Sequence, residues 1–390
     1  MPQKLTLGYL LPFLFLLCSS AYANALLNGL AVHEELGNEQ FIGALYSETL
    51  SDNADALTNG SSAIRMELKI VAPTGLTTRR FRRMWIEGMA INNPSQQLTA
   101  QADNMVKFDG MFKGHLEMND HVIFSQTPGE GVNISVNGVL LGNIDDDQFF
   151  PMLLRTWIGR VPLSSTYREN LLQIGKVDPS LQSRYNAINP SVSRVAAIKS
   201  WLQPAEPEPE PVQVATPEPK PVVPAPKVPA AVVAAKIDLP ALRQASSASS
   251  APAAETAPKA VAAVSKPEPA KPAPVQPAKI EEEPEPVLTA QSLLARQFYV
   301  SDLLKQIRSN VTYPRRAVAR GHEGGMRIAV TIDRKGEILT MSWLEKSEHD
   351  TLNKEAWESI QRAAPFPVIP DAISDTSFEF SAPVTFALPK

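Results

Sequence analysis

Cysteine is almost absent from this sequence, because Cys18 is the only one among 390 residues, and a disulfide within the chain is therefore excluded. The formal net charge is −4, so no concentrated Lys/Arg surface favours nucleic acid as a partner. The five histidines lack metal-ligand spacing, and the sequence contains no Ser-His-Asp elbow, phosphate-binding glycine loop or paired-carboxylate spacing. The sequence thus predicts no metal, no cofactor and no catalytic residues.

Aromatic residues are missing from a long central segment. Between Pro204 and Pro286 there is no Phe, Trp or Tyr, whereas 20 of the 35 prolines fall there. Such a composition cannot bury enough apolar surface to offset the entropy of ordering. We interpret residues 204–290 as a disordered Pro-rich linker. Pro-X alternation would stiffen it into an extended spacer that separates the two domains. An inert linker without a length requirement is the alternative. Two folded segments remain, residues 24–203 and 291–390.

The amino terminus has the pattern of an export signal. One basic residue, Lys4, precedes an apolar run from Leu5 to Leu17, and a small-x-small tripeptide ends at Ala23. Cleavage after Ala23 would place the mature chain in the periplasm. An uncleaved membrane anchor is the alternative, but the run contains Pro12 and is shorter than the roughly 20 apolar residues that span hydrocarbon.

The segment 24–203 has alternating and helical periodicities. Residues Ala63 to Val71 and Val132 to Val136 alternate as strands do, and Asn137-Gly138 supplies the positive φ angles of a tight hairpin. Helical spacing covers Thr77 to Met89 and Ser95 to Phe108. These patterns predict an α+β domain, an antiparallel sheet covered by helices. Four arginines near the start of the first helix could contact a membrane surface or a glycan, or be an ordinary solvated face: Arg79, Arg80, Arg82 and Arg83.

The segment 291–390 predicts a second, smaller α+β domain, a small open sheet packed on helices. Pro383 cannot donate to a strand ladder, which favours an edge position for the last strand. The expected elements are a helix at Ser301 to Ser309, strands at Met326 to Ile332 and Glu337 to Leu344, a helix at Leu352 to Ala363, and a strand at Ser377 to Leu388.

This second segment resembles the TonB carboxy-terminal domain family. The matching features are Tyr313-Pro314, Gly321, Ile332-Asp333 with Gly336, Phe366-Pro367, and the ending Ala382 to Phe386. The resemblance implies binding to an outer-membrane transporter or another envelope protein, and the linker resembles the TonB stalk. TonB-like transducers use an uncleaved amino-terminal helix carrying a Ser and a His, and the run from Leu5 to Leu17 contains neither.

The last strand is our candidate for partner binding. An exposed sheet edge can accept an extended segment as an additional strand, and natural edges are usually blunted unless they are used. A capped edge, or one paired in a dimer, is the alternative. The candidate residues are Ser377, Phe378, Glu379, Phe380 and Ser381, with Tyr313, Pro314, Arg315 and Arg316, whose arginines could steer toward acidic receptor residues or peptidoglycan.

The first segment resembles the bacterial chalcone isomerase-like family, through Asn28-Gly29, Val136-Asn137-Gly138, Phe149, Leu153 and Trp157. The resemblance implies a fold. Isomerases of this family hold a phenolate oxyanion with an Arg soon after the Asn-Gly region, where this sequence has His33, and Phe41 occupies the next strand. We therefore expect no enzyme activity. Fatty-acid-binding relatives of the fold leave open a carrier for a lipid or other apolar ligand.

Together these features predict a periplasmic, non-enzymatic adaptor of the TonB family. Its carboxy-terminal domain would bind envelope proteins by strand addition in support of transmembrane transport. The two alternatives are the apolar-ligand carrier and an energy transducer with an uncleaved anchor.

Overall fold

The structure is a computed structural model that describes residues 25–59, 62–203 and 288–388. The predicted export signal and the linker up to residue 287 lie outside the described residues. Gln203 and Leu288, which border that linker segment, belong to the same compact unit. Among the described residues no helix combines the length and the apolar character that crossing a membrane requires.

The first domain is built on a six-stranded antiparallel meander in which each strand pairs with the next along the chain. Asn137 and Gly138 have φ angles of 54° and 76° and form the tight turn between the last two strands, as the sequence predicted. The strands are β1 (Leu26–Glu35), β2 (Asn38–Ser47), β3 (Ile64–Ile70), β4 (His121–Thr127), β5 (Gly131–Val136) and β6 (Val139–Ile144).

Helices pack on this sheet and bury a core rich in aromatic side chains, including Trp85, Phe108, Phe124 and Trp157. The helix predicted from Ser95 to Phe108 is in fact two, because Gln101 leaves helical geometry (φ −102°, ψ 9°). The helices are α1 (Ala54–Asn59), α2 (Thr78–Asn92), α3 (Ser95–Ala100), α4 (Ala102–Asp109), α5 (Phe149–Ile158), α6 (Ser165–Leu171), α7 (Pro179–Ala187) and α8 (Val192–Ser200).

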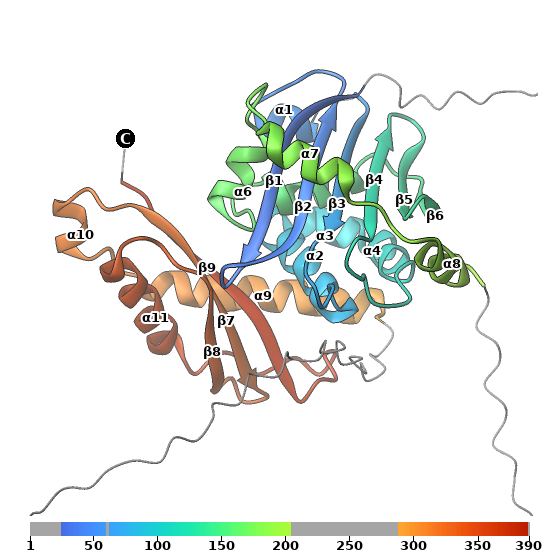
Figure 1. Ribbon diagram of the computed structural model, residues 1–390. Helices are drawn as coiled ribbons and strands as arrows, with labels where there is room; N and C mark the ends of the chain where they lie inside the picture. Colours follow the sequence, from blue (N-terminus) through green and yellow to red (C-terminus); the bar gives the residue numbers. More distant parts are fainter. Residues whose placement is uncertain (1–24, 60–61, 204–287, 389–390) are drawn as a thin grey trace, which may run out of the picture. The chain divides into compact units, whose positions relative to one another are not determined.

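The second domain has a three-stranded antiparallel sheet in the order β8-β7-β9 (Figure 1). Strand β9 is therefore at an edge of this sheet, and it pairs with β7 along its whole length, from Ser377 opposite Asp333 to Phe386 opposite Gly324. Both domains are α+β, which confirms the predicted fold class. The elements are α9 (Ala290–Asn310), α10 (Arg315–Ala319), β7 (Gly324–Asp333), β8 (Ile338–Glu345), α11 (Asp350–Ala363) and β9 (Ser377–Phe386).

Helix α9 contributes to both hydrophobic cores. Leu293, near its start, is fully buried in the core of the first domain, whereas Leu303 and Ile307 are buried in the core of the second. In Figure 1 the helix runs alongside elements of both domains. The sequence predicted only its second half, from Ser301 to Ser309. The missed first half begins at a capping box in which Thr289 and Ser292 exchange hydrogen bonds.

Candidate functional site

Every second residue of β9 directs its backbone N–H and C=O groups away from β7, toward the open edge of the sheet. The backbone N–H of Ser381 points away from β7, because it donates to the Glu87 carboxylate at 3.0 Å. In an antiparallel ladder, residues two apart face the same way, so Ser377, Glu379 and Pro383 also direct their backbone groups outward. Pro383, which has no N–H, thus occupies a position where no ladder bond to β7 is lost.

The predicted residues Phe378 and Phe380 contribute nothing to this outward edge. Their backbone groups lie on the β7 side of the strand, and their side chains are buried in the core, with exposures of 5% and 0%. The edge that a partner strand could use is therefore made by Ser377, Glu379 and Ser381. This alternation follows from the ladder register, which the sequence alone did not supply.

Tyr313, Pro314, Arg315 and Arg316 lie near the opposite end of β9 from Ser377. The Tyr313 ring packs edge-on against Phe386 at 5.1 Å between centroids, and its hydroxyl donates to the carbonyl of His322 at 2.6 Å. Arg315 and Arg316 are exposed at the start of α10. The sequence-predicted residues therefore form two separate groups along β9. Their role in partner binding stays a prediction.

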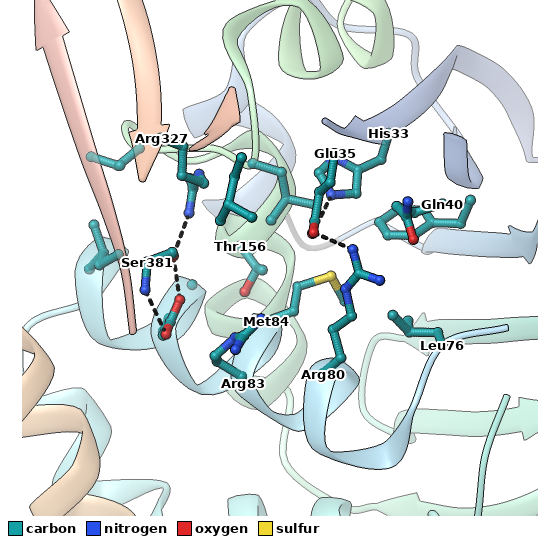
Figure 2. A pocket seen from close by; sticks show the side chains of 17 residues that line it. His33, Glu35, Gln40, Leu76, Arg80, Arg83, Met84, Thr156, Arg327 and Ser381 are labelled. Atoms are coloured by element: carbon teal, nitrogen blue, oxygen red, sulfur yellow. Dashed lines mark hydrogen bonds and ion pairs between the residues drawn. The ribbon is translucent and has the colours of Figure 1, made fainter. Parts of the chain in front are cut away.

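Helix α2 covers the middle of the outward edge. One oxygen of the buried Glu87 carboxylate accepts the Ser381 N–H at 3.0 Å, and the other accepts the Ser381 hydroxyl. One turn earlier on α2, Arg83 forms an ion pair with Glu379 of β9. Figure 2 shows the contacts of Ser381 with the carboxylate and with Arg327. At Ser381 the edge is thus capped, one of the alternatives that the sequence left open.

Arg327 of β7 completes this group of charges. Its guanidinium donates to the Ser381 hydroxyl at 3.0 Å and to the carbonyl of Pro162. Burial raises the pKa of Glu87, although the charge of Arg83 and the hydrogen bonds from Ser381 oppose it. The Glu87 carboxylate is therefore held by two hydrogen bonds and by cations from α2 and β7, in surroundings where an unpaired charge would be costly.

A small cavity of about 40 Å³ lies beside this cap. Residues of the first domain form most of its lining, and Arg327, Leu344 and Ser381 of the second domain complete it. His33, 4% exposed, contacts the rings of Phe41 and Tyr167, with centroids 4.8 and 5.8 Å away. Its Nε2 lies 3.3 Å from the carboxylate of Glu35, which also pairs with Arg80. His33 and Phe41, which the sequence placed on successive strands, both line this cavity, whereas the sequence did not single out Glu35 or Arg80 for it.

The ionisable groups of the first domain in this cavity, His33, Glu35 and Arg80, compensate one another. Burial lowers the pKa of the His33 imidazole, opposed by Glu35, so that the ring is neutral at pH 7. Burial alone would raise the pKa of Glu35, but the hydrogen bond from His33 and the charge of Arg80 outweigh it and lower the pKa to about 2. Glu35 is therefore ionised at neutral pH and engaged by two neighbours.

The low pKa of Glu35 predicts acid-sensitive stability. A Glu has a pKa of about 4.3 when unfolded, so a native value of about 2 contributes up to about 3 kcal/mol, present above pH 4.3 and lost as the pH falls toward 2. In urea titrations between pH 5 and pH 3, Glu35→Gln should lose less stability than the wild type. Glu34→Gln, at an exposed neighbouring position, is the control, and equal slopes for Glu35→Gln and wild type would contradict the prediction.

The arginine-rich start of α2 is mostly engaged within the protein. Arg80 pairs with Glu35, Arg82 with Asp109 at 2.6 Å and Arg83 with Glu379, whereas Arg79 is exposed. Within the described ranges no group of three or more His, Cys, Asp or Glu residues is placed to hold a metal ion. The sequence did not single out Glu87, although an acidic residue inside the apolar stretch from Met84 to Met89 was a usable signal.

Comparison with known proteins identifies two domains in the chain. Residues 19–173 match the chalcone isomerase-like family, and residues 309–388 match the family of Gram-negative bacterial TonB protein C-terminal domains. The chain therefore carries a chalcone isomerase-like domain followed by a TonB C-terminal domain, as the sequence predicted. The second of these indicates a protein of the bacterial envelope.

Three solved structures are similar to parts of the chain. A fatty-acid binding protein of Arabidopsis thaliana is 17% identical, with a TM-score of 0.32, and the match covers 38% of this chain and 87% of that one. Two solution structures of the TonB C-terminal domain from Helicobacter pylori are 24% and 27% identical, with TM-scores of 0.22 and 0.20; each match covers 24% of this chain, and 84% and 96% of those chains. No curated protein sequence matches the chain.

Proposed function

We propose that this protein is a periplasmic, non-enzymatic adaptor whose TonB C-terminal domain binds an outer-membrane transporter or another envelope protein by β-strand addition at β9, in support of transmembrane transport. The observation that carries the proposal is the edge position of β9, where Ser377, Glu379 and Ser381 turn their backbone groups away from β7. In this mode of recognition, backbone hydrogen bonds supply affinity and alternate side chains supply specificity.

The pocket beside His33 supports a non-enzymatic role for the first domain. A cavity of about 40 Å³ is far below the roughly 300–1,000 Å³ of small-molecule sites, so it has no room for a flavonoid. Its neutral His33 is also a weaker oxyanion holder than a guanidinium, and the nearby Arg80 is paired with Glu35. The same volume disfavours an acyl chain in this pocket.

Strand addition predicts a specific pattern of amide shifts in the full chain. We expect a panel of synthetic extended peptides from outer-membrane transporters to shift the amides of Ser377, Glu379 and Ser381 in an NMR titration. Peptides methylated at alternate backbone nitrogens should not, because they cannot complete the ladder. The Asn137-Gly138 hairpin is an internal control. Shifts that spare β9 across the whole panel, both in the wild type and in a Glu87→Ala variant that removes the carboxylate capping Ser381, would defeat the proposal.

Whether the amino terminus is cleaved separates the adaptor from an energy transducer. Intact-mass analysis of the exported protein should give a chain beginning at Asn24. A mass that retains the apolar run from Leu5 to Leu17 would favour the transducer instead.

A further inference from the structure

We propose that α2 of the chalcone isomerase-like domain closes the β9 edge by presenting Glu87 in place of a partner, and that the partner displacing it is an extended segment with a carboxylate beside Ser381. This inference rests on the proposed strand addition and names its regulation and the chemistry of its partner. It concerns contacts between residues of one compact unit.

Closure follows from the hydrogen-bond donors of Ser381. Its outward N–H is the donor that an added strand would require, and that N–H already donates to Glu87 at 3.0 Å. The hydroxyl donates to the second oxygen of the same carboxylate, and Ser381 is only 4% exposed. An added strand and Glu87 therefore compete for one backbone donor, so binding requires α2 to move away from β9.

A second pair of contacts restrains the same arrangement. Arg83, one turn before Glu87, forms an ion pair with Glu379, which is the next outward residue of β9. On the other edge of the sheet, the backbone N–H of Leu36, in the turn between β1 and β2, donates to the carbonyl of Leu344 in β8 at 3.0 Å. The first domain therefore contacts both edges of the TonB-type sheet, and the closure at Ser381 is not an isolated contact.

The chemistry of the partner follows from the two groups that remain at the edge when α2 moves away, the Arg327 guanidinium and the Ser381 hydroxyl. Arg327 belongs to β7, so it stays beside Ser381 when α2 withdraws. It then loses the nearby charge of Glu87, while Glu345 of β8 remains opposite it. Its positive charge is then only partly compensated, and the Ser381 hydroxyl has lost its carboxylate acceptor. An incoming strand with an Asp or Glu at this position would restore both the counter-charge and the acceptor for the Ser381 hydroxyl. The edge is therefore matched to an acidic extended segment.

Amide hydrogen exchange tests the closure without any partner. In the full chain, Glu87→Ala should accelerate exchange at the Ser381 amide by at least about tenfold, because that amide loses a charged acceptor. Glu87→Gln, which keeps an acceptor, should give a smaller change. Glu130→Ala, at an exposed turn, is the matched control. Unchanged exchange at Ser381 in Glu87→Ala would overturn the closure.

Arg83 provides a second variant if Glu87→Ala does not fold. Arg83→Ala removes the ion pair to Glu379 and should also accelerate exchange at the Ser381 amide, whereas Arg79→Ala, at an exposed position on the same helix, should not. Identical exchange in the Arg83 and Arg79 variants would contradict the closure.

Two labelled peptides test the partner chemistry by fluorescence anisotropy, SGETVTVTGS and its counterpart SGQTVTVTGS. Glu87→Ala should bind the acidic peptide at least about tenfold more tightly than the wild type does, and more tightly than it binds the Gln peptide. Equal affinity of wild type and variant would overturn the closure, and equal affinity for both peptides would overturn the carboxylate requirement. If exchange is accelerated but no variant binds either peptide, the proposed strand addition fails while the closure stands.

Discussion

A Leu303→Ala variant is expected to lose about 2–5 kcal/mol of unfolding free energy, because it removes a fully buried side chain from the core of the TonB-type domain. Leu293→Ala, ten residues earlier on α9, should cost a similar amount through the core of the chalcone isomerase-like domain. Since the two residues belong to one continuous helix, each variant should destabilise both domains, in a single urea transition followed at amides of both sheets.

An exposed leucine gives the matched control for these two variants. Leu339 of β8 is 56% exposed, so Leu339→Ala should change the unfolding free energy by no more than about 0.5 kcal/mol. The shared role of α9 would be contradicted if Leu303→Ala unfolded the TonB-type domain at lower urea while amides of the first sheet kept the wild-type midpoint.

Gly43→Ala is expected to be a strongly destabilising small substitution in the first domain. A Cβ atom at this position in β2 would lie 1.9 Å from the hydroxyl oxygen of Tyr167 and 2.9 Å from the Cε of Met66. Tyr167 is fully buried and packs edge-on against Phe41, with ring centroids 5.9 Å apart, so it has little freedom to retreat. Forcing such a shift should cost about 3 kcal/mol, measured by urea unfolding.

A second substitution tests this steric explanation. Tyr167→Leu vacates the space that the new Cβ needs, so Gly43→Ala should cost much less in that background than alone. Gly110→Ala is a control, because the nearest heavy atom to a Cβ there is 3.4 Å away. Additive costs in the double variant would show that the clash with Tyr167 is not the cause.

Local patterns were sufficient to predict many of the elements. The alternation from Ala63 to Val71 became β3, the Asn137-Gly138 pair became the β5–β6 turn, and the alternation from Met326 to Ile332 lies within β7. Each of these signals spans only a few residues, so neighbouring side chains already determine the conformation. The edge position of β9 agrees with Pro383, whose missing N–H is tolerated there.

The cap on that edge was beyond sequence reasoning. Glu87 and Ser381 are 294 positions apart, so no periodicity connects them. Helix α9 was only partly predicted for a related reason, because its two halves bury side chains in two different cores and do not share one continuous apolar stripe. The Glu35, Arg80 and His33 group likewise joins β1 to α2 through side chains alone.

The contact between Glu87 and Ser381 lies within one chain and one compact unit. Glu87 is therefore an intramolecular competitor, whose effective concentration at β9 does not fall when the protein is diluted. A partner strand can displace Glu87 only if its intrinsic affinity or its local concentration is high. The protein would therefore discriminate against partners of low affinity or low abundance.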